Sequence, residues 1–295
     1  MQNIPALKPM CRECMLQKRL HEYPQTISET DKERYMSFVL NEIENMENQQ
    51  GPTVATRNIY DMQKEMFGYH QSYWPLKEKY NRMILEQESI LRGNINNAED
   101  SLLLALQYGI VGNYIDFIAM DDIDVEKLQQ FIQEATNYKL DMETYQVLRN
   151  EILSAKSIVY LLDNCGEIVM DKLITECIQK LNPKADITVI VRGEEIYNDV
   201  TMDDAKQVGL TDIVSVIGNG SSVPGTCLDL VSDEVKEKLL NADVILSKGQ
   251  GNFETLQGCQ LNVYYIFLCK CDMVANLFHV PKLTPMLCNE LQKSL

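Results

Sequence analysis

Two side chains with oxygen donors follow a short apolar run in the second half of the chain. The run at residues 157–162 has the length and composition of a buried strand, and Asp163 and Asn164 come directly after it. Residues just past the carboxyl end of a strand line the ligand crevice of an open parallel sheet. Carboxylate and amide oxygens are hard ligands that suit a divalent cation. Both residues are also favoured at a helix N-cap, so capping is the alternative interpretation.

Polar, charged or glycine residues follow the other strand-like runs as well. Asp199 lies after the second run, and with Asp163 and Asn164 it could hold one Mg²⁺ or Mn²⁺. Lys248 and Lys270 follow the fourth and fifth runs and could meet the oxygens of a phosphate ester. A metal, two lysines and a positioned water suit phosphoryl transfer, because that chemistry depends on positioning and charge neutralisation.

Each of these features also has a simpler structural interpretation. Asn198 and Asp199 could form a turn and cap before a helix that begins near Met202. Lysines are usually solvated surface charges, and glycine-rich loops are common turn material. The placement of all of them at one expected sheet edge is what favours a ligand site.

Strand-like and helical runs alternate in the second half of the chain. Strands are predicted at 157–162, 186–191, 213–217, 243–246 and 263–268, with helices at 168–181, 202–208 and 233–240. Alternation of this kind predicts an α/β fold, with a mostly parallel sheet and helices on both of its faces.

The first half has helical periodicity and lacks strand-like runs. Helices are predicted from a capped start near residue 28, and at 53–67, 75–91, 98–108, 125–138 and 143–153. We therefore expect an all-helical domain over residues 1–155 and an α/β domain that binds metal and phosphate over residues 156–295.

Composition and charge limit the class of protein. The chain of 295 residues has a formal charge of −16, which argues against nucleic acid as a partner, since such proteins need a basic face. No apolar run approaches the roughly 20 residues needed to span a bilayer, so no membrane partner is expected. The first residues lack the pattern of a signal peptide, and nine scattered cysteines suit reduced thiols, so we expect a cytoplasmic protein.

Several motif classes are missing from the sequence. It contains no P-loop, no Gly-x-Gly-x-x-Gly after the first strand and no Gly-x-Ser-x-Gly, which disfavours P-loop kinases, dinucleotide-binding oxidoreductases and serine hydrolases. None of the three histidines lies near the predicted strand ends, which disfavours a histidine-based hydrolase.

Taken together, the strand-end motifs resemble those of the DUF89 family, the ARMT1-like metal-dependent damage-control phosphatases. The resemblance spans most of the chain. It is carried by Asp163-Asn164-x-Gly166-Glu167, Arg192-Gly193 with Asn198-Asp199-Val200-Thr201, Lys248-Gly249-x-x-Asn252-Phe253-Glu254, Lys270, and the segment Gly112-Asn113-Tyr114-Ile115-Asp116-Phe117. The Cys11-x-x-Cys14 pair resembles the prokaryotic branch, whereas Phe267-Leu268-Cys269-Lys270 departs from the Arg-Thr-x-Lys motif of the eukaryotic branch.

The resemblance implies a helical domain packed on a Rossmann-like three-layer α/β/α core. It implies a divalent metal (Mn²⁺, Co²⁺, Ni²⁺ or Mg²⁺) held by Asp163, Asn164 and Asp199. It also implies phosphate contacts from Lys270, from the loop containing Lys248, Gly249 and Asn252, and from Arg192. The implied substrate is a small phosphorylated metabolite such as a sugar phosphate or a nucleotide.

The expected mechanism is direct hydrolysis, in which the metal binds a phosphate oxygen and lowers the pKa of a bound water. Lys248 and Lys270 would neutralise developing charge, and Glu167 could order the water. Asn113 and Asp116 would contact substrate or the outer shell of the metal. The alternative mechanism uses Asp163 as a nucleophile and forms an aspartyl phosphate.

Other functions remain open from the sequence. A zinc site at Cys11 and Cys14 is weighed against a reduced helical pair without metal, which we favour because no second Cys-x-x-Cys is present. A metabolite-binding module without turnover and an S-adenosylmethionine-dependent methyltransferase are the alternatives to a phosphatase.

Overall fold

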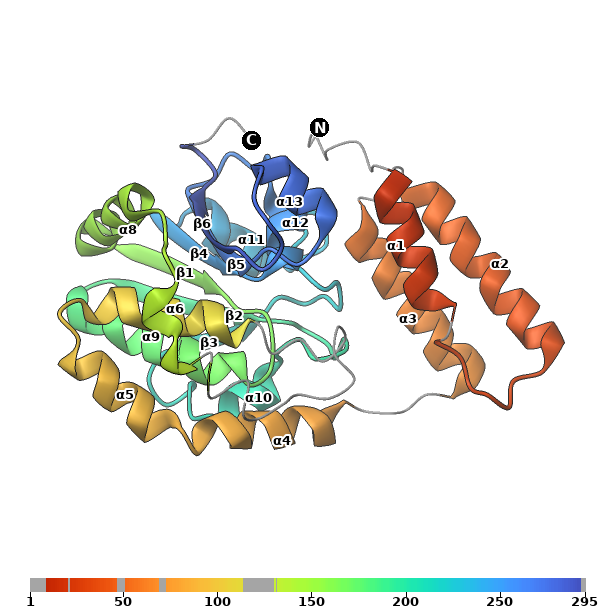
Figure 1. Cartoon of the computed structure of the whole chain (residues 1–295), viewed down its shortest axis with the longest axis horizontal. Helices are drawn as coiled ribbons and strands as arrows, with labels where there is room; N and C mark the ends of the chain where they lie inside the picture. Colours follow the sequence, from red (N-terminus) through yellow and green to blue (C-terminus); the bar gives the residue numbers. More distant parts are fainter. Residues whose placement is uncertain are drawn as a thin grey trace.

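The computed structural model describes residues 9–20, 22–46, 51–68, 73–113, 130 and 132–292. Its centre is a six-stranded sheet flanked by helices (Figure 1). The strands are β1 (Ser157–Leu161), β2 (Asp186–Val191), β3 (Ser215–Gly218), β4 (Val244–Lys248), β5 (Val263–Leu268) and β6 (Pro285–Asn289).

The order of the strands in the sheet is β3-β2-β1-β4-β5-β6. Strands β1 to β5 pair in parallel, and β6 pairs antiparallel with β5. The chain moves from β1 toward β2 and later from β4 toward β5, so the order reverses between β1 and β4. Ligands of open α/β sheets bind outside the carboxyl ends of the strands at such a point.

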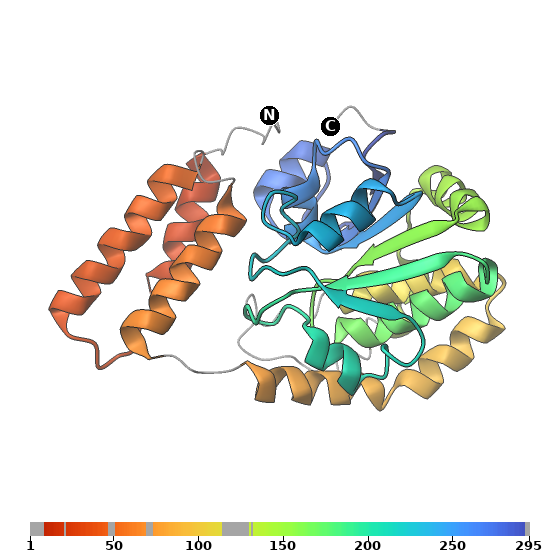
Figure 2. The same ribbon diagram turned by 180° about the vertical axis from the view of Figure 1, so that it is seen from behind.

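Helices cover both faces of the sheet, which confirms the three-layer α/β/α prediction (Figure 2). One core contains Ile158, Tyr160 and Leu162 with apolar residues of α6 (Ser101–Gly112) and α9 (Glu167–Leu181). The other contains Val159 and Leu161 with residues of α11 (Asp233–Leu240), α12 (Gln250–Leu256) and α13 (Asp272–Phe278). Neighbouring residues of β1 enter opposite cores because side chains alternate across a strand.

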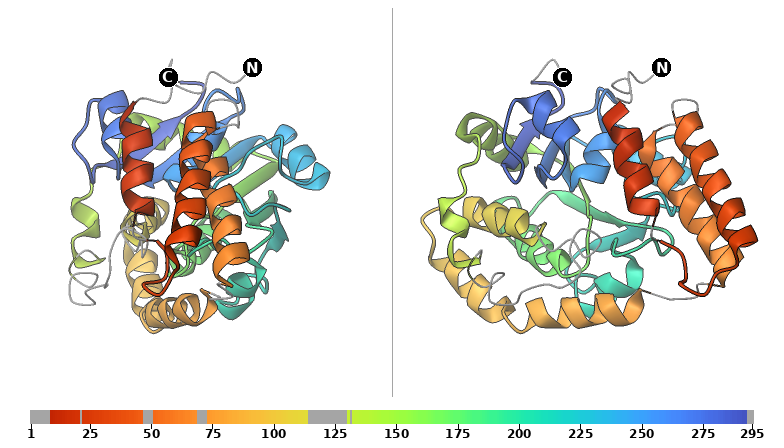
Figure 3. Two further views of the ribbon diagram at one scale, coloured as in Figure 1. Left: turned by 90° about the vertical axis from the view of Figure 1, so that its right-hand side faces the viewer. Right: turned by 45° about the vertical axis from the view of Figure 1, so that its right-hand side comes forward.

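The first three helices form a separate apolar cluster. They are α1 (Pro9–Arg19), α2 (Glu29–Asn45) and α3 (Pro52–Phe67), with Tyr35, Val39, Met46 and Ile59 in their shared core. This group lies beside the sheet rather than on either of its faces (Figures 1 and 3).

The later helices of the first half pack with the sheet instead. They are α4 (Trp74–Leu85), α5 (Glu88–Asn97), α6, the 3₁₀ turn η2 (Ala135–Asn137) and α8 (Met142–Ser154), and residues of all of them enter the same core as β1. Helix α6 is buried on nearly all sides, as expected of a helix enclosed by other elements. The division at residue 155 stays a prediction. The packing places α4, α5, α6 and α8 with the sheet.

Local sequence explains most boundaries. The expected helix at 75–91 is two helices, since the chain turns at Glu86 and Gln87 between α4 and α5. Helix α10 (Met202–Gln207) begins with a capping box formed by Thr201 and Asp204. The expected helix at 125–138 lies mostly outside the described residues. Within the described part of the chain, no helix is long and apolar enough to cross a membrane.

Candidate active site

Asp163 lies at the reversal point of the sheet, two residues past the end of β1. Its side chain packs against the backbone of Gly249, the residue that follows β4. A Cβ at position 249 would lie 1.9 Å from Asp163 Oδ2, and the φ angle of Gly249 is +81°. Only glycine accommodates both the close approach and this backbone angle.

The loop that carries Asp199 is joined to the Asp163 loop by backbone hydrogen bonds. The Val200 amide donates to the Asp163 carbonyl (2.9 Å), and the Cys165 amide donates to the Asn198 carbonyl (2.9 Å). Asn164 and Asp199 form an isolated antiparallel bridge. The structure therefore brings together Asp163, Asn164 and Asp199, which the sequence proposed as one ligand set.

Arg192 links the acidic residues of the site. Its side chain is 1% exposed, and its Nε donates to Asp199 Oδ2 at 2.6 Å. The same guanidinium reaches Asp163 Oδ1 at 3.5 Å and Asn252 Oδ1 at 3.4 Å. Its strongest contact is therefore with a carboxylate of the protein.

Lys248 is fully buried and donates to three oxygens of the protein. Its ammonium contacts Glu167 Oε1, Asp171 Oδ1 (2.8 Å) and the Gly109 carbonyl (3.1 Å). An ammonium has three N–H donors, so this arrangement leaves none for a phosphate. The structure thus differs from the expected phosphate contact, because α6 and α9 enclose the end of β4.

Asp171 and Tyr160 belong to the same buried network and were missed from the sequence. The Tyr160 hydroxyl donates to Asp171 Oδ1 at 2.6 Å, and burial raises the pKa of Tyr160 well above its ordinary value. Asp171 follows Glu167 by four residues on α9, so both face Lys248. That spacing was the available signal in the sequence.

Glu167 and Asn113 lie beside Asp163 and Asn164. Glu167 is fully buried, and its Oε2 accepts from the side-chain amides of Asn113 (3.1 Å) and Asn164 (3.2 Å). Asn113 also donates to Asp163 Oδ2 (3.2 Å), while its own oxygen accepts from the Leu268 amide (3.1 Å). Asp116 lies outside the described residues.

The remaining expected phosphate contacts differ in exposure. Asn252 is buried and donates to the carbonyls of Leu162 (3.1 Å) and Lys248 (2.7 Å), so it ties the ends of β1 and β4 together. Lys270 is only partly buried, and its backbone amide donates to Gln250 Oε1 (3.0 Å). Its positive charge partly offsets the rise in the pKa of Asp163.

The electrostatics of the cluster favour a cation. Burial, Asp199 and Glu167 together raise the pKa of Asp163 to about 8, against the opposing charges of Arg192 and Lys270. Four buried carboxylates (Asp163, Glu167, Asp171 and Asp199) face two buried cations (Arg192 and Lys248), an excess of two negative charges when all are ionised. Buried carboxylates of this kind need either a proton, as the raised pKa of Asp163 indicates, or a bound cation.

The donor set fits a hard divalent cation, with one adjustment at Asn164. The side-chain nitrogen of Asn164 donates to Asp163 Oδ2 (2.7 Å), and its oxygen accepts from Asn198 (2.9 Å). Rotation of the Asn164 side-chain amide by about 180° would exchange its nitrogen and oxygen, and the oxygen would then face a metal beside Asp163. Among the described residues, no three histidine, cysteine or carboxylate side chains are already spaced to hold a metal, so the set depends on this oxygen.

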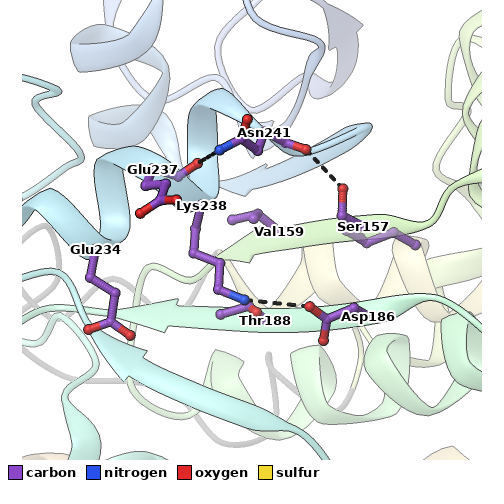
Figure 4. A pocket seen from close by; sticks show the side chains of 9 residues that line it. Ser157, Val159, Asp186, Thr188, Glu234, Glu237, Lys238 and Asn241 are labelled. Carbon is purple, nitrogen blue, oxygen red and sulfur yellow. Dashed lines mark hydrogen bonds and ion pairs between the residues drawn. The ribbon is translucent and has the colours of Figure 1, made fainter.

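A cavity of about 340 Å³ lies elsewhere, against the amino ends of β1 and β2 (Figure 4). It is lined by Ser157, Asp186, Thr188 and residues of α11 such as Lys238, which pairs with Asp186 at 3.5 Å. Ser157 and Asp186 are the first residues of their strands, so this cavity is at the opposite end of the sheet from Asp163.

The fold and site define a Rossmann-like α/β protein with a carboxylate-rich centre at the reversal point of its sheet. A family model described as the damage-control phosphatase ARMT1-like domain matches residues 7–284. The chain therefore belongs to the ARMT1-like damage-control phosphatase family, the DUF89 family, as its motifs indicated.

Relatives and a solved structure agree with this assignment. The chain is 31% identical over 286 residues to an uncharacterized protein of Methanocaldococcus jannaschii, covering 91% of this chain and 90% of that protein. It is 26% identical over 277 residues to a damage-control phosphatase of Archaeoglobus fulgidus, covering 91% and 94%. A crystal structure of a DUF89 family protein from Pyrococcus horikoshii matches with a TM-score of 0.79 and 28% identity, covering 95% and 97%. The family model and the Archaeoglobus relative, which is named a damage-control phosphatase, support a phosphatase role for this chain.

Proposed function

We propose that this protein is a metal-dependent phosphomonoesterase that acts on small phosphorylated metabolites. The observation that carries the proposal is the convergence of Asp163, Asn164 and Asp199 at the reversal point of the sheet. Excess negative charge surrounds them, and the chain belongs to a family whose named members are phosphatases.

Asp163, Asn164 and Asp199 would hold the divalent cation, through two carboxylates and an amide oxygen. When bound, a Mn²⁺, Co²⁺, Ni²⁺ or Mg²⁺ ion supplies Lewis acidity to a phosphate oxygen and lowers the pKa of its water. Arg192 holds Asp199 in position and helps to balance its charge. Hydrogen bonds of this kind, made to a metal-ligating carboxylate by a neighbouring side chain, fix the orientation of the carboxylate.

Lys270 is the lysine that we assign to the substrate phosphate. It is partly exposed beside α12, whereas the Lys248 ammonium already donates to three protein oxygens. A cation at this place stabilises negative charge that develops on the phosphate oxygens in the transition state.

We assign Lys248 and Glu167 a positioning role. Lys248 holds Glu167, and Glu167 in turn accepts from Asn113 and Asn164. This chain of hydrogen bonds fixes the amide groups that face Asp163. Glu167 would therefore act through Asn164 rather than directly on the water.

The test is phosphate release by metal-free protein to which Mn²⁺, Co²⁺, Ni²⁺ or Mg²⁺ is added back. The substrates are an aryl phosphate, sugar phosphates and nucleotides. We expect Asp163→Asn to lower release by more than about 100-fold, since losing an outer-shell partner of a metal ligand already costs 10–100-fold. The matched control is Asp186→Asn, which changes an exposed aspartate at the other end of the sheet and should retain full activity.

Two results would redirect the proposal. Tight metal binding without phosphate release from any substrate would support a binding module instead. A phosphoenzyme trapped by rapid acid quench, and absent from Asp163→Asn, would replace direct hydrolysis by the aspartyl-phosphate route. In the second case the buried Asp163 carboxylate is the nucleophile.

A further inference from the structure

One side of α4 contacts both loops of the candidate active site. The contacts come from Tyr73, just before the helix, and from Lys77 and Asn81, which follow at intervals of four residues. Residues spaced by four lie on the same face of a helix. We call these three residues the α4 clamp.

Asn81 joins the Asp163 loop to α10. Its side-chain oxygen accepts from the Gly166 amide at 2.6 Å. Its side-chain nitrogen donates to Asp204 Oδ1 (2.9 Å) and Gln207 Oε1 (2.7 Å). Asn81 is fully buried, so water could not replace its hydrogen bonds if its side chain were lost. The Gly166 amide, Asp204 and Gln207 would then each lose a hydrogen-bond partner.

Lys77 holds the Asp199 loop from the same side. Its ammonium donates to the backbone carbonyl of Asp199 and to Asp204 Oδ2, both at 2.6 Å. Asp204 Oδ2 also accepts from the Thr201 amide (2.8 Å) in the capping box of α10. The Lys77 side chain is 2% exposed, and a buried lysine is costly unless its charge is paired.

Tyr73 contacts the beginning of the same loop. Its backbone amide donates to Glu195 Oε1 at 2.5 Å, and its ring lies 5.8 Å from the ring of Tyr197. The α4 clamp therefore contacts the segment from Glu195 to Asp204 at several points, and through Asn81 it also contacts the Asp163 loop.

We infer that the α4 clamp sets the spacing between Asp163 and Asp199, so that Lys77 and Asn81 are positioning residues of the active site. The inference rests on the proposed function, because it concerns the distance between the proposed metal ligands. Lys77 reaches Asp199 through its backbone carbonyl, and Asn81 reaches the backbone amide of Gly166, two residues past Asn164.

The alternative is that the clamp only stabilises the fold, and a matched pair of variants separates the two. Asn81→Leu removes all three hydrogen bonds of Asn81 while it keeps the number and branching of the side-chain heavy atoms. Ile84→Ala, on the same helix, removes a fully buried side chain of the main core. Both should lower the melting temperature, but only Asn81→Leu should disturb the site.

The first measurement is the affinity of the full-length protein for Mn²⁺ by titration calorimetry. We expect the dissociation constant to rise by about 10–100-fold in Asn81→Leu, the range for outer-shell partners of metal ligands. Ile84→Ala should keep the wild-type value. Equal affinities in the two variants would overturn the inference.

The second measurement is backbone hydrogen exchange of the metal-free full-length protein. Asn81→Leu should speed exchange at residues 163–168 and 195–204 by about tenfold or more relative to Ile84→Ala, which corresponds to about 1.4 kcal/mol of lost protection. Unchanged exchange in these two loops would also overturn the inference. Because no metal is present, this result is independent of whether the wild-type protein releases phosphate.

Asn81→Asp provides a milder test should Asn81→Leu fail to fold. It keeps an acceptor for the Gly166 amide but places a second carboxylate 2.9 Å from Asp204. We expect faster exchange at 195–204 with little change at 163–168. Equal changes in the exchange rates of both loops, or no change in either, would contradict the inference that Asn81 holds each loop through a different hydrogen bond.

Discussion

At the scale of single residues, the site depends on positions where only one residue type fits. Gly249 is the clearest, since its missing side chain is the space that the Asp163 carboxylate occupies. Gly258 has nearly the same φ angle (+80°), but nothing lies within 4 Å of the place where its Cβ would be. A comparison of alanine variants at the two glycines therefore distinguishes the effect of backbone strain from the effect of displacing Asp163.

We expect Gly249→Ala to impair metal binding and phosphate release, and Gly258→Ala to leave both unchanged. Each variant places an alanine at a positive φ angle and adds backbone strain of about 1–3 kcal/mol. Only the first forces Asp163 to move, and a misplacement of about 1 Å can cost about 100-fold in rate. The measurements are Mn²⁺ affinity, phosphate release and the melting temperature of each variant. Full activity of Gly249→Ala would show that phosphate release does not depend on the observed position of the Asp163 carboxylate.

At the scale of elements, ion pairs fasten α5 to α9, the helix that carries Glu167. Lys172 donates to Glu88 (2.7 Å), and Arg92 donates to Glu88 (2.8 Å) and Glu176 (2.7 Å). Burial opposes ionisation of Glu88, but the hydrogen bonds from Lys172 and Arg92 outweigh it and lower the pKa of this carboxyl below its ordinary value.

We expect Glu88→Gln to lower the free energy of unfolding by about 0.5–1 kcal/mol at pH 7, a small value because the pairs are partly exposed. A lowered carboxyl pKa stabilises the fold above the pKa of the unfolded chain, and this contribution disappears as the pH falls through the lower, folded value. The difference between variant and wild type should therefore vanish in acid. Urea unfolding from pH 7 to pH 3 measures it, with Glu78→Gln in the exposed Glu78–Arg82 pair as the control that should change little. A difference that does not shrink between pH 7 and pH 3 would assign the effect to packing.

At the scale of the whole molecule, the α1–α3 group meets the active-site loops through an aromatic contact. The buried Arg19 donates to the Tyr197 hydroxyl (2.9 Å), and Tyr60 of α3 packs on the Tyr197 ring at 4.8 Å. Tyr197 lies two residues before Asp199 and has a φ angle of +45°. The α1–α3 group thus touches the loop that supplies a proposed metal ligand.

We expect the α1–α3 group to open at a lower free energy than the sheet, with α6 protected together with β1. The reason is that α6 shares the main core, whereas α1–α3 have a core of their own. Arg19→Met should lower the opening free energy of α1–α3 by about 1–3 kcal/mol through loss of its buried hydrogen bond, and should leave β1 unchanged. Native-state hydrogen exchange measures this. Opening of α6 together with α1–α3 would instead support a folding boundary near residue 155.

Periodicity and turn chemistry were sufficient to predict much of the architecture. The five parallel strands were located within a few residues, because each is a short apolar run bounded by polar residues. Strand β6, the short helices α12 and α13 and the break between α4 and α5 were missed. Short elements carry too few residues to show a period, and β6 is defined only by its pairing with β5.

The sequence by itself determined which polar residues gather at the strand ends, since parallel strands place their carboxyl ends at one edge. Only the tertiary structure decided what each residue does there. Lys248 and Lys270 look alike in the sequence, but α6 and α9 bury the first among carboxylates while the second stays partly exposed. Lys77 and Asn81 gave no signal because their partners lie more than 80 positions away in the chain. Contacts at such separations come from the packing of elements, which local patterns do not encode.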